Sequence, residues 1–420
     1  MFSVLIPHGA QVRRGVAGTL LALLTVTGVI AQPNVNWQRY IGKISPAEEA
    51  SGTVRLSANR LVTTGGYQSV NTDTLRAFLL FTRPNGDTIR QLFTTVPNVF
   101  GWATLVAADS GDFYTAGAKF DTLPNGSLET VSYVCRFDSV GTLRWQHRYS
   151  VGGYTVPVRL VTVTDGVLIA STVFSSQSDM MEVRRLDGQG NVRWTRYFGA
   201  NHSPEDLITL PDGSYAALTF GPGPVPPPWS FWTTDMRIFK ISPQGDSITD
   251  VYVGDSAAND IGNRLLVTTD GGLLVAGRQS ILPRSTPRRG IVRKLDANWQ
   301  EEWRYSFAPP TGNYESGGEY YDVHELQNGN LLLMGIGSPR YDCRLDEVAA
   351  PGTNVWSWTA PAGAGGIVPE AFDLYYDAPT TSWLASGWGT DRMPVPGGRR
   401  DLWLASLGSL PPPATIDYCA

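Results

Sequence analysis

Aromatic side chains stand beside charged ones in three loop-like stretches of this chain. An aromatic ring stacks on a sugar ring or a peptide group, and a carboxylate accepts hydrogen bonds from hydroxyl and amide groups. We therefore predict that these stretches form a ligand-binding site. The predicted site residues are Trp229, Trp232, Tyr314, Glu315, Glu319, Tyr320, Trp388 and Arg392. The alternative is structural: the rings would cover a sheet and the acids would face solvent.

Catalysis of glycan cleavage would need two carboxylates about 5 to 10 Å apart. Asp206 and Asp260 occupy similar positions just before an apolar stretch, so we interpret both as turn caps. The remaining acids near loop-like stretches are Glu315, Glu319 and Glu370. We assign no catalytic residue. Binding is the leading function, and a glycan-active hydrolase or lyase that uses such carboxylates is the alternative.

The sequence holds few residues for metal or cofactor chemistry. His147, His202 and His324 are isolated from one another, which is not the spacing of a metal site. Neither the Gly-x-Ser-x-Gly motif nor a phosphate-binding loop occurs. We expect no metal and no cofactor.

A repeated pattern must position the predicted site residues. Each copy has two apolar stretches joined by a turn such as Asp212-Gly213 or Asp270-Gly271. Asp-Gly favours a two-residue β-hairpin, because both central residues need positive φ. The copies recur about every 53 residues. They are Val54–Gly66, Leu105–Gly117, Leu160–Ser171, Leu207–Thr219, Leu265–Gly277, Val323–Gly335 and Phe372–Gly387.

A second hairpin follows the first in each copy. Its turn has Asp or Ser first and Gly fourth, as in Asp138–Gly141, which is typical of a type I turn. Tryptophan follows the first turn residue by seven positions, at Trp145, Trp194 and Trp303. This constant spacing predicts a fixed register. We expect these tryptophans to pack between neighbouring sheets.

The two ends of the repeat array complement each other. Trp37–Gly42 and Trp194–Gly199 both read W-x-R-Y-x-G, and in mid-chain this pattern ends a copy. The last copy stops at Leu407 without that strand. The sequence therefore predicts an all-β ring, a seven-bladed β-propeller of four-stranded antiparallel blades that the N-terminal strand closes. Rings of six or eight blades are the alternatives.

The repeat resembles a family of secreted bacterial propellers that is common in the Bacteroidetes. Asp270–Gly277 reads DGGLLVAG, and Lys294–Trp303 reads KLDANWQEEW. The resemblance covers Trp37–Leu407 and is specific for the fold, since the family is not tied to one chemistry. It implies cargo of the type IX secretion route. The chain departs from that pattern at Pro411–Ala420, where a β-sandwich sorting domain would follow.

The chain divides into three parts. Residues 1–31 read as a signal peptide, with Arg13-Arg14, an apolar run and a small-residue cleavage site before Gln32. Residues 32–408 form the propeller, and residues 409–420 read as a C-terminal tail or a truncated linker. We expect secretion or display at the cell surface, with no membrane span after cleavage.

Composition limits the partners. The net charge is −5, and the mature chain without Arg13 and Arg14 would carry about −7. No basic stripe occurs, so we expect no nucleic acid. An extracellular glycan or protein is the expected partner of a monomeric chain. Cys135 and Cys343 occupy equal places in different copies, too far apart for a disulfide, and we expect both to be buried.

Loop lengths predict where a ligand binds. The turns within hairpins are short, whereas the connections between strands two and three, and those between blades, vary in length. In a propeller both kinds of variable connection emerge on one face. Because function on rigid scaffolds concentrates in variable loops, we predict the ligand face there.

Overall fold

The computed structural model contains 28 strands and one short 3-10 helix, η2 (Ala378–Thr380), among the residues that it describes. These are residues 32–41, 47–68, 75–94, 99–108, 111–122, 126, 128–150, 154–174, 178–223, 234–255, 258–281, 288–307, 317–337, 342–361, 368–390 and 400–414. No described helix has the length and apolar character needed to cross a membrane. The predicted signal peptide, residues 1–31, lies outside the described residues.

Consecutive strands pair antiparallel in groups of four. The first groups along the chain are β2 (Ala47–Ser57), β3 (Arg60–Gln68), β4 (Leu75–Thr82), β5 (Thr88–Phe93); β6 (Val99–Ala107), β7 (Phe113–Thr122), β8 (Leu128–Phe137), β9 (Leu143–Tyr149); and β10 (Tyr154–Val163), β11 (Gly166–Phe174), β12 (Asp179–Asp187), β13 (Val192–Phe198). Next come β14 (Ser203–Thr209), β15 (Tyr215–Pro222), β16 (Thr234–Ile241), β17 (Ser247–Val253); β18 (Ala258–Val267), β19 (Leu273–Ile281), β20 (Arg289–Leu295), β21 (Glu301–Phe307); and β22 (Glu319–Glu325), β23 (Leu331–Gly337), β24 (Asp342–Ala349), β25 (Thr353–Thr359). The last group joins β26 (Val368–Asp377), β27 (Ser382–Thr390) and β28 (Arg400–Gly408) to β1 (Asn34–Ile41).

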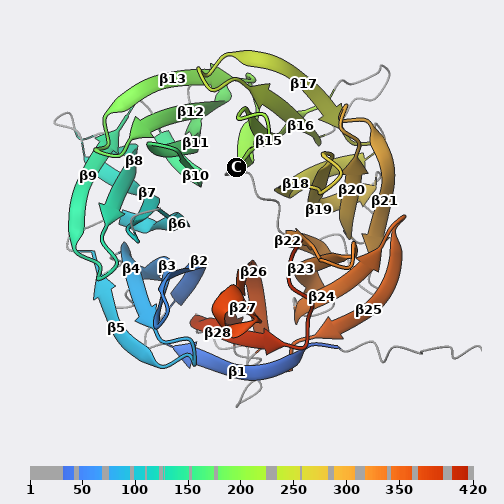
Figure 1. Ribbon diagram of the computed structural model, residues 1–420. Helices are drawn as coiled ribbons and strands as arrows, with labels where there is room; N and C mark the ends of the chain where they lie inside the picture. Colours follow the sequence, from blue (N-terminus) through green and yellow to red (C-terminus); the bar gives the residue numbers. More distant parts are fainter. Residues whose placement is uncertain are drawn as a thin grey trace, which may run out of the picture. The chain divides into compact units, whose positions relative to one another are not determined.

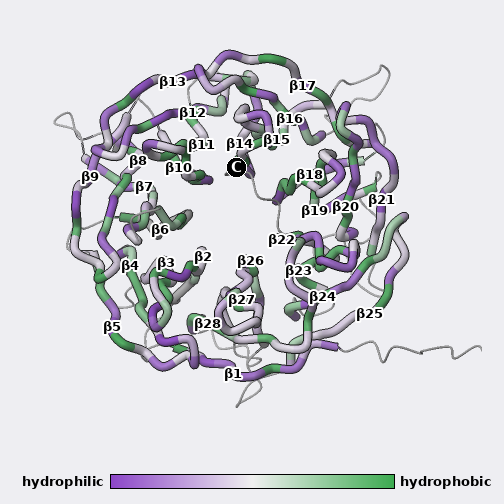
Figure 2. The backbone as a smooth tube through the Cα atoms, viewed as in Figure 1, coloured by the Kyte–Doolittle hydropathy of each residue, from purple (hydrophilic) through white to green (hydrophobic). Residues whose placement is uncertain are grey.

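Within residues 32–414 these sheets follow one another around a ring (Figure 1). The first strand of each sheet lies nearest the middle, and the fourth lies at the outer edge (Figure 1). The outer strands carry both hydrophilic and hydrophobic residues (Figure 2), as in β9 and β21, where exposed and half-buried residues alternate. The expected all-β propeller of four-stranded antiparallel sheets is confirmed.

The first strand of the ring closes its last sheet. β1 runs antiparallel to β28, with Trp37 opposite Ser406 and Tyr40 opposite Trp403. This pairing removes the free edge that β28 would otherwise present to solvent. The closure predicted from the W-x-R-Y-x-G pattern is confirmed.

Several outer-strand tryptophans link one sheet to the next. Trp37 Nε1 donates to the carbonyl of Pro84 at 3.0 Å, and Trp194 Nε1 donates to that of Pro243 at 3.2 Å. Beneath Trp37 lies Gly86, with φ of 82°, where a Cβ would come within 2.7 Å of the ring. Glycine at the fourth turn position therefore has two roles. It adopts the positive φ that the turn needs, and its lack of a Cβ leaves room for the tryptophan ring. The expected packing of these rings between sheets is confirmed.

Truncation of these rings gives a test of ring closure. Removing a large aromatic side chain from a packed site costs about 3–5 kcal/mol, so we expect Trp37→Ala and Trp194→Ala to lower the free energy of unfolding by similar amounts. Tyr197→Ala is the control, because Tyr197 is 46% exposed on the same strand as Trp194. Urea denaturation of the three variants measures the effect. A parental stability for Trp37→Ala beside a weakened Trp194→Ala would contradict the closure.

Residues 409–414 do not form a free tail or linker. The Pro411 carbonyl accepts from Trp383 Nε1 at 3.0 Å, and the Pro412 carbonyl accepts from the Gln327 N–H at 3.0 Å. The segment thus runs from the closing sheet to the sheet before it. These carbonyls and the buried Leu410 pack residues 409–414 against the ring.

Two further expectations concern local structure. Cys135 and Cys343 are free and buried, as predicted. The first-hairpin turns differ from the prediction: Gly213 and Gly271 have positive φ, but Asp212 does not. The Gly213 N–H donates to the Leu210 carbonyl at 2.9 Å, so four residues form the turn and only glycine adopts the left-handed conformation.

A β-bulge interrupts each innermost strand at the same place. One residue there has no partner in the second strand, and the pairing resumes at the next residue. In β6 a second residue, Gly101, also lacks a partner. The bulged residues are Ser51, Ala103, Val158, Glu205, Asn263, Tyr321 and Phe372. A bulge re-aims the side chains around it. In this ring the bulges place two layers of side chains, described next.

Candidate functional site

The residues that follow the bulges form a belt of opposite charges across neighbouring innermost strands. In chain order they include Arg159, Asp206, Arg264, Asp322 and Asp373. Arg159 Nε lies 2.8 Å from Asp206 Oδ1, and Arg264 Nε lies 3.0 Å from Asp322 Oδ1. Arg159 and Arg264 thus pair with the buried Asp206 and Asp322, whereas Asp373 Oδ2 accepts a hydrogen bond from the Thr53 N–H at 3.1 Å. We call these five residues the charge belt.

The aspartates of the charge belt also bind backbone groups of the next sheet. Asp206 Oδ2 accepts from the Leu265 N–H at 2.8 Å, and Asp322 Oδ2 accepts from the Leu374 N–H at 2.9 Å. Burial raises the pKa of Asp206 to about 6, an effect that Arg159 opposes. These contacts show that the belt joins sheets rather than binding a ligand.

The turn-cap interpretation therefore holds for only one of the two aspartates. Asp260 accepts from the Asp255 N–H at 2.8 Å, across the turn that precedes β18. Asp206 instead links β14 to the following sheet, so its interpretation as a turn cap is wrong. The equivalent of Asp206 in β18 is Arg264, one residue after the bulge.

The bulged residue Glu205 lines a cavity of about 520 Å³. The cavity lies at the ends of β11 and β15 and at the starts of β12 and β16. It also borders the connection from β13 to β14. Phe174 and Phe220 give it apolar walls, and Asp179 and Ser203 add polar groups. This is the face on which we predicted the ligand. We call this space the Glu205 cavity.

The environment of Glu205 favours the neutral form of its carboxyl. Burial raises the pKa of its carboxyl to about 8, Glu319 and Asp206 raise it further, and Arg278 opposes the shift. A neutral carboxyl can donate a hydrogen bond through its hydroxyl as well as accept one. The Glu205 cavity therefore has a donor where an ionised acid would offer only acceptors.

A cluster of fixed charges stands beside Glu205. Glu319 is 3% exposed, and both of its carboxylate oxygens accept from Arg278 Nη1, at 3.0 and 2.9 Å. Arg288 Nη1 lies 3.5 Å from Glu319, and Asn263 Nδ2 donates to it at 3.0 Å. Glu319 is thus held from three directions, and it orients Arg278 in turn.

An aromatic row continues from this cluster across the next two sheets. The rings of Tyr321 and Phe372 lie 4.8 Å apart, and those of Phe372 and Trp388 lie 4.2 Å apart. All three side chains are half-buried. Glu319 and Arg278 act on the pKa of Tyr321, which burial raises, so the row adjoins the charged cluster.

Comparisons with known proteins bear on the fold. No family model matches the chain, and no curated protein matches it. A polysaccharide lyase has a similar structure, with a TM-score of 0.55 and 10% identity over 92% of this chain and 94% of that one. A protein of unknown function from Bacteroides caccae has a TM-score of 0.41 and 13% identity over 75% of this chain and 94% of that one. The likeness to the lyase shows a shared propeller fold.

The structure places the predicted site residues in different parts of the ring. Glu319 lies in the charged cluster that acts on Glu205, and Trp388 lies in the aromatic row. Tyr320 is 1% exposed and donates to Asp346 at 2.5 Å, so its predicted role in ligand binding is replaced by a place in the core. The others lie outside the described residues: Trp229, Trp232, Tyr314, Glu315 and Arg392.

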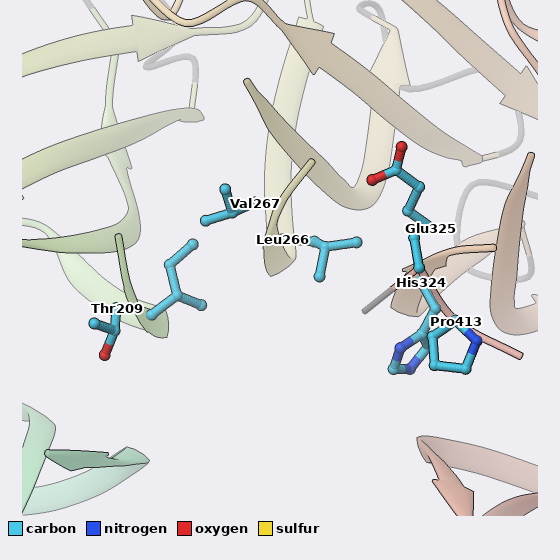
Figure 3. A pocket seen from close by; sticks show the side chains of 8 residues that line it. Thr209, Leu266, Val267, His324, Glu325 and Pro413 are labelled. Carbon is cyan, nitrogen blue, oxygen red and sulfur yellow. The ribbon is translucent and has the colours of Figure 1, made fainter. Parts of the chain in front are cut away.

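A second cavity, of about 320 Å³, lies at the other end of the innermost strands (Figure 3). Leu266, Val267 and Pro413 give it a mainly apolar lining. Two of its polar side chains, His324 and Glu325, already have partners. His324 Nε2 donates to the Leu374 carbonyl at 2.8 Å, and Glu325 accepts twice from Thr269 at 2.7 Å. We therefore place the candidate site at the Glu205 cavity. The described part of the chain has no cluster of His, Cys, Asp or Glu suited to a metal ion.

The pKa of Glu205 predicts how stability changes with pH. An ordinary glutamate has a pKa near 4.5, against about 8 for Glu205. As pH rises between these values the unfolded chain releases this proton and the folded chain retains it, so folded stability is lost. Glu205→Gln removes that loss, and we expect its melting temperature to gain on the parent as the pH rises from about 5 to about 8. Asp246→Asn, at a 72% exposed side chain, should follow the parent. Parallel curves for Glu205→Gln and the parent would contradict the prediction.

Proposed function

We propose that this chain is an extracellular propeller that binds a carbohydrate in the Glu205 cavity. The observation that carries the proposal is the coincidence of a neutral carboxyl with a cavity of about 520 Å³ on the variable-loop face. Sugars present hydroxyl groups that both donate and accept, and the wall formed by Glu205, Asp179 and Ser203 offers both kinds of partner. Phe174 and Phe220 provide apolar surface for the faces of sugar rings.

The proposed location follows from residues 1–31, read as a signal peptide that ends before Gln32. Expression in a bacterium with an intact export system tests it. N-terminal sequencing of the exported protein should return Gln32, and a chain retained in the cell with Met1 would refute it.

A glycan array tests the binding function. The mature chain should bind a defined set of glycans, and Glu205→Ala should lose that binding while it retains the parental circular dichroism spectrum. Asp246→Asn, remote from the cavity, should bind as the parent does. Absence of binding by the folded parent, or unchanged binding by Glu205→Ala, would refute the assignment of the site.

Glycan cleavage is the second candidate function, and the protonated state of Glu205 favours it. A carboxyl that keeps its proton at neutral pH can act as a general acid toward a leaving oxygen. The fold shared with a polysaccharide lyase allows such an activity without specifying it. Incubation of each bound glycan with the protein, followed by a reducing-end assay, separates the two functions. Cleavage that Glu205→Gln abolishes would establish an enzyme.

A further inference from the structure

We infer that the Glu205 cavity is selective for an amino sugar, whose ammonium group binds Asp179 beside the ring of Phe174. This inference rests on the proposed function, because it names the class of carbohydrate that the same site takes. Asp179 becomes the residue that determines specificity.

Phe174 and Asp179 are neighbours in the wall of the cavity. They stand directly opposite each other in the antiparallel pair of β11 and β12, and both line the cavity. Residues opposite each other in such a pair project from the same side of the sheet, with Cβ atoms about 4.5–5.5 Å apart. One small group of a ligand can therefore contact the aromatic ring and the carboxylate together.

Both side chains are available to a ligand. Phe174 is 41% exposed, although it is a large apolar residue. Asp179 is half-buried, and no hydrogen bond or ion pair joins its carboxylate to another described residue. An ammonium group suits this pair, because a cation is attracted to the face of an aromatic ring and donates charge-assisted hydrogen bonds to a carboxylate.

The side chains of the lining favour a cation over an anion. Among the described residues that line the cavity, Asp179 and Glu205 are acidic and none is a lysine, an arginine or a histidine. Arg278 and Arg288 are not part of this lining, and both lie within 3.5 Å of Glu319. A ligand anion would meet the Asp179 carboxylate without a basic partner in the lining, whereas an ammonium group would be attracted to it.

The other polar groups of the lining suit the hydroxyl groups of a sugar. Ser203 stands opposite Phe220 in the pair of β14 and β15, so a hydroxyl lies beside a second aromatic ring. The Ser203 hydroxyl and the neutral Glu205 carboxyl can each donate and accept hydrogen bonds. The cavity thus offers one place for a cation and several partners for hydroxyl groups, which is the composition of an amino sugar.

Two oligosaccharides that differ only at carbon 2 of each ring test the inference: a β-1,4-linked glucosamine tetramer and cellotetraose, which has hydroxyl groups in place of the amino groups. Isothermal titration calorimetry at about pH 5.5 keeps the amino groups protonated, since amino groups beside electron-withdrawing atoms have a pKa of about 7.7–8.0. The parent should bind the glucosamine tetramer about tenfold or more tightly than cellotetraose. Asp179→Asn should remove that difference, and Phe174→Leu should reduce it about two- to fivefold.

Asp165→Asn is the matched control. It removes the same charge from the same sheet at the opposite end of β11, where the Asp165 side chain is 57% exposed. This variant should keep the preference of the parent for the glucosamine tetramer. A preference lost equally in Asp165→Asn and Asp179→Asn would reflect the overall charge of the chain and would overturn the assignment to Asp179.

The outcomes separate this inference from the proposed function. Equal affinity of the parent for the two tetramers, or a preference that Asp179→Asn retains, overturns the selectivity and leaves carbohydrate binding intact. A parent that binds other glycans of the array but neither tetramer has the same meaning. A parent that binds no saccharide at all refutes the proposed function, and this inference with it. Circular dichroism of each variant confirms that a lost affinity does not reflect unfolding.

Discussion

Deletion of residues 32–41 is expected to unfold the propeller. The deleted segment contains β1 (Asn34–Ile41), and without it β28 keeps an unpaired edge along the closing sheet. Trp37 would also leave its place against Gly86 and the Pro84 carbonyl. The loss of Trp37 alone costs about 3–5 kcal/mol, and a whole domain is stable by only about 5–15 kcal/mol. The backbone hydrogen bonds and the packing of Tyr40 and Ile41 add to that cost.

Circular dichroism and size-exclusion chromatography measure the effect of this deletion. We expect loss of the cooperative melting transition and self-association through the exposed edge of β28. Arg39→Ala is the control, because Arg39 is 44% exposed and lies 3.8 Å from Asp87, which is 52% exposed. An exposed pair of this kind contributes up to about 1 kcal/mol. A deleted chain that melted at the temperature of the parent would exclude β1 as the closing strand.

Asp206→Ala should be the most destabilising single substitution in the charge belt. Asp206 is fully buried, and its carboxylate binds Arg159 and two backbone N–H groups, of Leu207 and Leu265. Its removal leaves a partly buried guanidinium without its partner, which typically costs about 3–5 kcal/mol. Asp206→Asn keeps an acceptor oxygen and should cost less.

Guanidinium chloride denaturation at neutral pH compares these variants. Asp246→Ala serves as the exposed control, since Asp246 and Arg196 lie 3.9 Å apart with side chains 72% and 46% exposed. We expect it to change the free energy of unfolding by less than about 1 kcal/mol. If Asp206→Ala behaved like Asp246→Ala, the charge belt would not hold the sheets together.

The ring could be predicted from the sequence because its determinants are local and repeated. These determinants are the glycine in the turn between the third and fourth strands of a sheet, the tryptophan at a fixed spacing and the W-x-R-Y-x-G pattern. The residues of each determinant lie close together in the sequence. Trp145 illustrates this: its Nε1 donates to the Gly188 carbonyl of the next sheet at 2.9 Å, the equivalent of the Trp194 contact. A pattern that recurs along the chain therefore indicates the backbone geometry that the copies share.

The candidate site could not be predicted in the same way, because it depends on the bulges. The bulged residues include serine, alanine, valine, glutamate, asparagine, tyrosine and phenylalanine, so no residue type marks the position. A bulge shifts the side-chain alternation by one residue. That shift places Tyr320 in the core and Tyr321 in the aromatic row, and it separates Glu205 in the cavity from Asp206 in the belt.

The pairing of β1 with β28 also sets the order in which the chain can mature. A ribosome or an export channel releases a chain from its N-terminus, so the residues of β1 emerge among the first of the propeller. Their partner, β28, begins at Arg400 and emerges after every other strand. Until then the backbone of β1 lacks its partner strand, although the residues that Trp37 packs against, Pro84 and Gly86, have already emerged. The ring therefore cannot close before β28 has emerged and paired with β1.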